Sequence, residues 1–169
     1  TLALASIGLC FPFVTLITAF ANLFGLGGAP LCAMARGKGN REGAQGIMVN
    51  AGFMLLLSGA VLTVLGITFH RPLLYLFGAS EVTYPYASSY IVIYLIGTLC
   101  VMLSLGLNPY INCQGFARTG MLTVALGAAA NIVLDPIFIF ALHLGVRGAA
   151  IATVLSQFLS AAWVVKFLT

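Results

Sequence analysis

The sequence predicts an all-α, polytopic membrane protein with five transmembrane helices. The chain has 169 residues, of which 62% are hydrophobic and only 6% are charged, and its mean hydropathy is +1.13. A soluble domain carries roughly 25% charged residues, because its surface faces water. The apolar residues also form long continuous runs, unlike the alternating segments of about ten residues that build a membrane β-barrel. These observations exclude a soluble globule and favour a helix bundle in a bilayer.

The few charged residues mark where the predicted helices begin and end. Residues 1–35, 43–69 and 82–117 hold no charge, and Arg118 and Lys166 bound the later apolar runs. A membrane-crossing helix needs about 20 mainly apolar residues, so each run is expected to cross once. In chain order, the predicted helices are 3–35, 42–69, 85–116, 120–141 and 147–168.

Short connections with turn-forming residues separate these helices. In order, they are centred on residues 37–40, 78–81, 118–120 and 144–146. Residues 71–77 are predicted to form a short interfacial helix before the second connection. Tyr84, Tyr86 and Tyr90 follow that connection and are typical of the aromatic belt at a membrane surface.

The distribution of Lys and Arg predicts the orientation in the membrane. If the five helices alternate in direction, one end of the bundle carries Arg36, Lys38, Arg41, Arg118 and Lys166, and the other carries Arg71 and Arg147. The positive-inside rule then makes the loops near 36–42 and 118 and the C-terminus cytoplasmic. Anionic lipid at that surface accounts for the net charge of +4, so we expect the cell membrane and no nucleic acid as partners. The chain would then start on the outer side without a Met or a signal sequence, which indicates a fragment.

Asp135 is the main candidate functional residue, because it is the only acid away from the ends of the predicted helices. An ionisable group at membrane depth costs about 2.5–3.5 kcal/mol even on the mildest insertion scale, so it has to face protein or water. Asn131 lies one turn earlier on the same helical face. Pro136 has no N–H, so the carbonyl of Ile132 loses its helical donor. Acid, amide and carbonyl together form an oxygen-rich patch.

The next helix is expected to bring Thr153 to the depth of Asp135. A turn near Leu144 places both residues about 9 Å below the outer end of an antiparallel hairpin. Oxygen ligands suit Na⁺ or a proton better than a transition metal. The sequence therefore predicts a cation or proton site at Asp135, Asn131 and Thr153. An interhelical hydrogen bond is the alternative interpretation of the Asn and Thr side chains.

Several segments resemble the multidrug and toxic compound extrusion (MATE) transporters. The most specific are NIVLDPIFIF at 131–140 and LGVRGAAIAT at 144–153, which are similar to the fifth and sixth helices of that family. Residues 25–40 resemble the end of its second helix and the following loop. Residues 113–120 resemble its loop between helices four and five, so the resemblance covers nearly the whole chain.

The resemblance to MATE transporters implies both architecture and function. That family has two six-helix bundles and exports small, cationic, amphipathic organic compounds in exchange for Na⁺ or H⁺. This chain would supply helices two to six, so the first helix and the second bundle of the same polypeptide are expected to be missing. By the same resemblance, Asp135, Asn131 and Thr153 match the cation or proton site. Ala149 matches a position that contributes its backbone carbonyl, and Asn108 is a weaker match on helix four.

The sequence is also compatible with two other functions. A flippase for lipid-linked saccharides would share the two-bundle architecture, but its cavity would need basic residues for pyrophosphate, and no Lys or Arg lies in the interior of a predicted helix. A non-transporting structural subunit would not need an isolated membrane acid. No enzyme is expected, because the H-E-x-x-H and G-x-S-x-G motifs and a second acid for a dyad are absent. No organic cofactor is expected beside the coupling ion.

Overall fold

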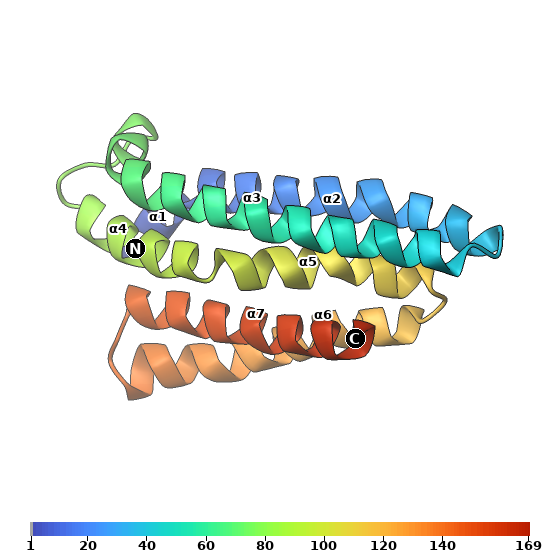
Figure 1. Cartoon of the computed structure of the whole chain (residues 1–169). Helices are drawn as coiled ribbons and strands as arrows, with labels where there is room; N and C mark the ends of the chain where they lie inside the picture. Colours follow the sequence, from blue (N-terminus) through green and yellow to red (C-terminus); the bar gives the residue numbers. More distant parts are fainter. Residues whose placement is uncertain (1) are drawn as a thin grey trace.

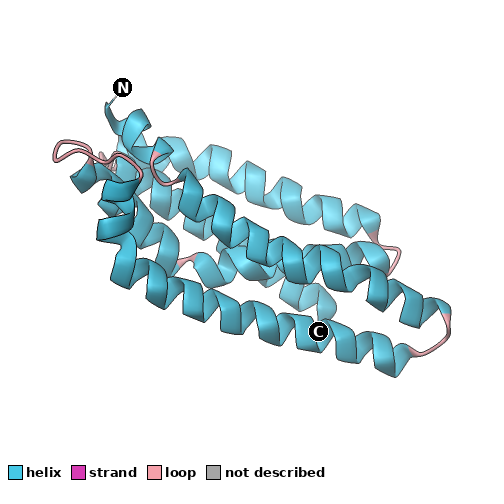
Figure 2. Cartoon of the chain, turned by 90° about the horizontal axis from the view of Figure 1, so that it is seen from above, coloured by secondary structure: helices cyan, strands magenta, loops and turns pink. Residues whose placement is uncertain are grey.

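The computed structural model describes residues 2–169, and within that range the chain forms helices and connections but no strand. The helices lie side by side in one elongated bundle (Figure 1). They are α1 (Leu2–Gly8), α2 (Phe11–Gly37), α3 (Arg41–Leu76), α4 (Tyr84–Ile96), α5 (Thr98–Cys113), α6 (Ala117–Pro136), the π-helical turn η1 (Ile137–Ala141) and α7 (Val146–Leu168). Most of the connecting loops gather at the two ends of the bundle (Figure 2). The predicted all-α bundle is confirmed.

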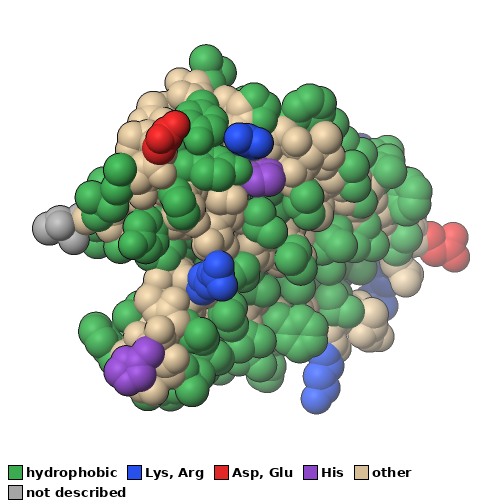
Figure 3. All heavy atoms as spheres, turned by 90° about the vertical axis from the view of Figure 1, so that its left-hand side faces the viewer, with side chains coloured by type: hydrophobic (Ala, Val, Ile, Leu, Met, Phe, Trp, Pro, Cys, Tyr) green, Lys and Arg blue, Asp and Glu red, His purple; other side chains and the backbone are tan. Residues whose placement is uncertain are grey.

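Four helical stretches of the described chain are long and apolar enough to cross a membrane, and a bent pair makes a fifth crossing. They are Leu2–Gly37, Arg41–Leu76, Tyr84–Ile96 with Thr98–Cys113, Ala117–Ala141 and Val146–Leu168. These stretches correspond in order to the five predicted helices. Large apolar side chains cover the outside of the bundle, as Phe53, Val64 and Ile132 illustrate with exposed fractions of 61%, 63% and 71%. Figure 3 views the bundle from one end and shows mainly hydrophobic side chains with few charges there. A bundle whose sides face lipid needs such an apolar exterior.

The first two crossings differ in detail from the prediction. Leu9 and Cys10 interrupt the first crossing between α1 and α2. The second continues through Pro72 to Leu76, so residues 71–77 do not form a separate interfacial helix. Proline near a helix end removes one hydrogen bond, but its fixed φ is compatible with the helix, so it does not force a break.

The third crossing bends by 56° at Gly97, where one straight helix was expected. A Cβ atom at Gly97 would lie 2.5 Å from a methyl group of Val154 on α7. The bend therefore lies where Val154 of α7 packs against the backbone between α4 and α5.

The third connection is also placed earlier than predicted. Residues 114–116 form the turn, and Gly115 adopts a φ of +90° that terminates α5. Arg118, expected in the turn, lies in the first turn of α6. Gly120, also expected in the turn, is buried where α6 packs against the side chains of Asn112 and Asn108.

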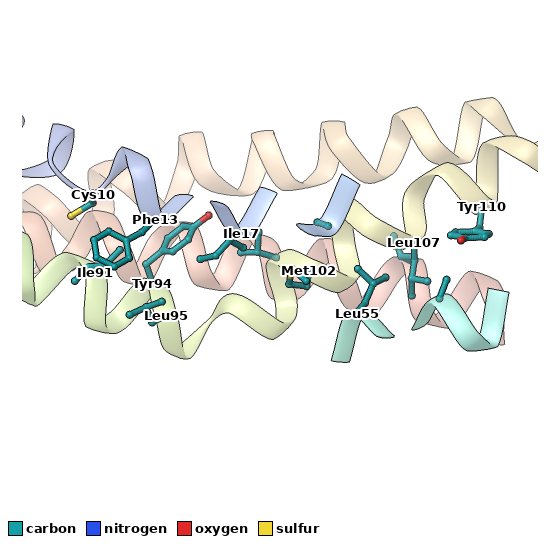
Figure 4. Close-up of a cluster of buried hydrophobic side chains, with 14 of the residues drawn as sticks. Cys10, Phe13, Ile17, Leu55, Ile91, Tyr94, Leu95, Met102, Leu107 and Tyr110 are labelled. Atoms are coloured by element: carbon teal, nitrogen blue, oxygen red, sulfur yellow. The ribbon is translucent and has the colours of Figure 1, made fainter. Parts of the chain in front are cut away.

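The core of the bundle follows α5, which packs against α2, α3, α6 and α7. Figure 4 shows side chains such as Phe13, Ile17 and Met102 in this core. A Cβ atom at Gly25 on α2 would lie 2.6 Å from the carbonyl oxygen of Gly106 on α5, so the two backbones are in direct contact. Nearby, the Tyr110 hydroxyl donates a hydrogen bond of 2.8 Å to the carbonyl of Phe24. Small residues at helix contacts are typical of membrane bundles, which rely on close packing.

Candidate functional site

The hairpin of α6, η1 and α7 carries most of the predicted site. Residues 142–145 connect its two arms, and His143 and Gly145 adopt φ values of +53° and +57°. A Cβ atom at Gly148 would lie 2.6 Å from the carbonyl oxygen of Phe138. The first turn of α7 therefore packs directly on the backbone of η1, and this contact fixes the relative position of the two arms.

A π-helical turn follows the candidate acid directly. Pro136 is the last residue of α6, and residues 137–141 form η1. The amide of Leu142 donates to the carbonyl of Ile137, five residues earlier, at 3.0 Å. Since proline cannot supply the N–H that the α-helical pattern requires, the hydrogen bonding changes register at this position. Such π-turns occur often at functional sites.

Asp135 and Asn131 lie together on α6, as the spacing of four residues predicted. The Asn131 amide nitrogen, Nδ2, donates to Oδ1 of Asp135 at 3.4 Å. Both side chains are half-buried. The hydrogen bond therefore links the carboxylate directly to the amide.

A polar cavity of about 260 Å³ lies between α5, α6 and α7, next to this pair. We call it the central cavity. Its lining residues are Ser104, Leu105, Asn108, Thr123, Val124, Gly127, Ala128, Asn131, Thr153, Ser156, Gln157 and Ser160. Three predicted site residues from three helices, Asn108, Asn131 and Thr153, therefore share one cavity. Asp135 does not line it and reaches it through Asn131.

Hydrogen bonds between helices hold the walls of the central cavity. The Ser104 hydroxyl on α5 donates to Oε1 of Gln157 on α7 at 2.6 Å. The Ser160 hydroxyl on α7 donates to the carbonyl of Thr123 on α6 at 3.2 Å. Within residues 2–169, the buried Oδ1 atom of Asn108 has no hydrogen-bond partner. A buried acceptor of this kind is suited to a water molecule or a cation.

Thr153 and Ala149 interact with each other on α7. The Thr153 hydroxyl donates to the carbonyl of Ala149 at 2.9 Å. The hydroxyl hydrogen is thereby used within the helix, and the oxygen keeps its lone pairs for another group. The Ala149 carbonyl, predicted as a ligand, is already an acceptor for Thr153 and does not line the central cavity.

Tyr90 on α4 was expected in the interfacial aromatic belt, but it is a neighbour of the site. Its phenol lies near Thr153 and Asp135. The ring is half-buried and stacks on Tyr94, with ring centroids 6.1 Å apart. A tyrosine near a predicted helix start gives no signal of this role, because only the packing of α4 on α7 turns it inward.

The arrangement supplies one carboxylate and several neutral oxygens in a bundle that otherwise faces lipid. A carboxylate with amide and hydroxyl oxygens can hold a hard monovalent cation or a proton. Both neutralise the same charge, so the two would compete for Asp135. The walls are helices in close contact, which keeps these oxygens at fixed spacing.

Several known proteins are similar to this chain in sequence. Residues 1–137 match the model of the MatE family. The chain is 33% identical over 161 residues to an FAD transporter of Shewanella oneidensis, covering 92% of this chain and 35% of that relative. It is 30% identical over 154 residues to the multidrug export protein MepA of Staphylococcus haemolyticus, covering 91% and 34%. Both relatives are named for transport or export and not for an enzymatic reaction.

Solved structures show the same fold. A crystal structure of MATE in the bent conformation superposes with a TM-score of 0.95 at 32% identity, and the match covers 99% of this chain and 37% of that one. An outward-facing MATE transporter superposes with a TM-score of 0.93 at 33% identity, covering 98% and 37%. The chain thus spans little more than a third of the length of the proteins it resembles.

Proposed function

The chain belongs to the MatE family of membrane transporters, as the motifs around Asp135 predicted, and we propose that it forms the cation-coupling part of a secondary transporter. The complete protein would export cationic, amphipathic compounds in exchange for Na⁺ or H⁺. It would contain a further helix before α1 and a second six-helix bundle. Binding of the ion would favour one of two arrangements of these bundles, so that the cleft between them opens to each side of the membrane in turn.

The observation that carries this proposal is the pair Asp135 and Asn131 beside the central cavity. An isolated acid at membrane depth is costly and marks ion or proton pathways in membrane proteins. Here the acid is oriented by an amide that also lines a cavity with Asn108 and Thr153. A non-transporting subunit would have no need for this arrangement. Na⁺ and H⁺ are both candidates, because either one neutralises the carboxylate.

The lining of the central cavity favours a cationic over an anionic substrate. It contains hydroxyl and amide groups and no Lys or Arg. The relative named MepA is a multidrug export protein, whereas another relative is named an FAD transporter. FAD carries a negatively charged pyrophosphate, which requires basic partners. The same argument disfavours a flippase for lipid-linked saccharides.

Replacement of the acid tests the proposal. We expect Asp135→Asn in the complete protein to reduce ion-driven efflux of a fluorescent cation from membrane vesicles by at least about tenfold, because loss of one charged ligand costs about 1.4 kcal/mol or more. Glu81→Gln, which removes an acid from the loop before α4, is the matched control and should retain efflux. Equal efflux by the two variants would refute the role of Asp135.

The same vesicles separate the coupling ions and the substrate classes. Efflux driven by a Na⁺ gradient at equal pH on both sides identifies Na⁺, and efflux driven by a pH gradient without Na⁺ identifies H⁺. Addition of FAD distinguishes the alternatives, because a cation-specific protein should export the dye at an unchanged rate. Strong competition by FAD would contradict the proposed substrate class.

The orientation proposed for the bundle places the turn between α2 and α3 in the cytoplasm. Five of the seven Lys and Arg residues lie at that end of the described helices. A Lys38→Cys variant of the complete protein should react with a membrane-impermeant maleimide only after the cells are opened. Labelling of the unsubstituted protein, which has its own cysteines, is the background for this comparison. Labelling in intact cells would reverse the orientation.

A further inference from the structure

A second polar cavity lies at the opposite end of the bundle from the loop between α6 and α7. It has a volume of about 380 Å³, and we call it the basic cavity. Its lining residues are Cys32, Arg36, Arg41, Ala44, Gln45, Met48, Gln114 and Leu168. Figure 1 shows the turn between α2 and α3, which carries the two arginines, at the right-hand end of the bundle. The lining contains two arginines and two glutamines but no acid.

The turn between α2 and α3 brings the two arginines together. Gly39 adopts a φ of +77°, and Asn40 accepts a hydrogen bond of 2.8 Å from the amide of Gly43, which fixes the start of α3. Arg36 lies in the last turn of α2, and it lines the cavity together with Cys32, one turn earlier on the same helix. Arg41 occupies the first turn of α3, where the helix dipole is positive. Positive charge therefore converges on this cavity from two helices.

The chemistry of the lining suits a phosphate group. Guanidinium groups present several donors in a planar arrangement that binds two phosphate oxygens at once. The Gln114 amide donates to the thioether sulfur of Met48 at 3.8 Å, which is a weak hydrogen bond. A phosphate oxygen would be a much stronger acceptor for the same amide. Glu42, the acid next to Arg41 in the sequence, does not line the cavity.

Three apolar residues complete the lining of the basic cavity, and we call them its floor. They are Ala44, Met48 and Leu168. Met48 follows Arg41 by seven residues, which is about 10 Å along the axis of α3. The lining thus extends along α3 from the charged end of the bundle toward the apolar middle of that helix. A free phosphate would use only its outer part, whereas a phospholipid has an apolar portion attached to its phosphate.

We propose that the basic cavity binds the headgroup of an anionic phospholipid. Arg36 and Arg41 bind the phosphate oxygens, and the side-chain amides of Gln45 and Gln114 donate to the same group. The glycerol and the first methylene groups of the lipid pack against Met48. The proposed orientation places this site in the cytoplasmic leaflet, where anionic lipids attract basic segments. This proposal does not depend on the transported substrate.

Lipid binding to the purified complete protein tests the site. Phosphatidylglycerol and phosphatidylcholine are titrated separately in a neutral detergent, and bound lipid is counted by native mass spectrometry. We expect a preference for phosphatidylglycerol that falls by at least about tenfold in the double variant Arg36→Gln/Arg41→Gln. The matched control Arg71→Gln/Arg147→Gln removes the same charge at the other end of the bundle and should keep the preference.

Three other outcomes of this experiment would each refute the proposal. Equal binding of the two lipids by the unsubstituted protein would show that another segment covers the cavity or that it takes no lipid. Equal losses in both double variants would show a general charge effect. Displacement of phosphatidylglycerol by millimolar inorganic phosphate would identify soluble phosphate as the ligand.

A second variant covers the case in which the double variant fails to fold. Met48→Trp leaves both arginines in place and fills the apolar floor. It should weaken phosphatidylglycerol binding, because the glycerol and the first methylene groups of the lipid lose their place beside residue 48. Unaltered phosphatidylglycerol binding by this variant would refute the proposed position of the lipid.

Discussion

The contact between α2 and α5 makes a quantitative prediction at Gly25. A Cβ atom there would lie 2.6 Å from the carbonyl oxygen of Gly106, and ordinary contacts begin at 3.4 Å. In Gly25→Ala, the two helices therefore have to separate by about 0.8 Å, because both partners at this contact are backbone and neither can rotate away. Overpacking of this kind costs about 1–3 kcal/mol. For a chain of this length, each kcal/mol lowers the unfolding temperature by about 2–4 °C, so we expect a decrease of about 5 °C.

Gly27→Ala is the matched control, because a Cβ atom at Gly27 has no atom within 4 Å. Both substitutions remove a glycine from the same helix and gain the same helix propensity, up to about 1 kcal/mol. The difference between the two unfolding temperatures, measured in detergent by loss of the monodisperse peak after heating, thus isolates the cost of the contact. Equal unfolding temperatures for the two variants would show that α2 and α5 are not in backbone contact.

Three further variants examine single interactions. Tyr110→Phe should lower the free energy of unfolding by about 1 kcal/mol, because it removes the hydrogen bond to the Phe24 carbonyl. The control Tyr86→Phe changes an exposed ring and should leave the unfolding temperature unchanged in the same melting assay. Gly145→Ala should lower the free energy of unfolding by about 1–3 kcal/mol, because φ of +57° with ψ of −126° is strained for any residue with a Cβ atom. An unchanged free energy of unfolding would contradict this backbone geometry. Thr153→Val keeps the shape of the side chain on α7 but removes its hydroxyl oxygen from the central cavity. Ion-driven efflux should therefore fall, while the unfolding temperature stays within about 1 °C of that of the unsubstituted protein. Unchanged efflux would exclude Thr153 from the ion site.

Much of the architecture was predictable because the bilayer constrains it strongly. Few charges can lie in the hydrocarbon region, so the charged residues had to mark the ends of the five crossings. The antiparallel hairpin of α6 and α7 follows from its short connection, and the pairing of Asp135 with Asn131 follows from helical spacing alone. Pro136 was predicted to leave the carbonyl of Ile132 without its helical donor, but the change of register to a π-turn after it was not predicted.

Other features depended on how the helices pack against each other. Gly97 is one glycine among 19, and only the approach of Val154 identifies it as the bend. Tyr90 has the sequence context of an interfacial aromatic residue, yet the packing of α4 on α7 places it beside Thr153. The basic cavity joins residues from α2, α3, the loop after α5 and the end of α7, and no local pattern connects these segments.

The sequence by itself determined the membrane location, the number and order of the crossings, the family and the acid at the centre of the proposed site. These follow from local quantities: hydropathy along the chain, the placement of charges, and motifs on single helices. Only the tertiary structure decided which polar side chains share a cavity, which glycines are in backbone contact, and where the two arginines meet. The physical reason is that helix formation satisfies the backbone within each segment, whereas the contacts between segments depend on the shapes of several helices at once.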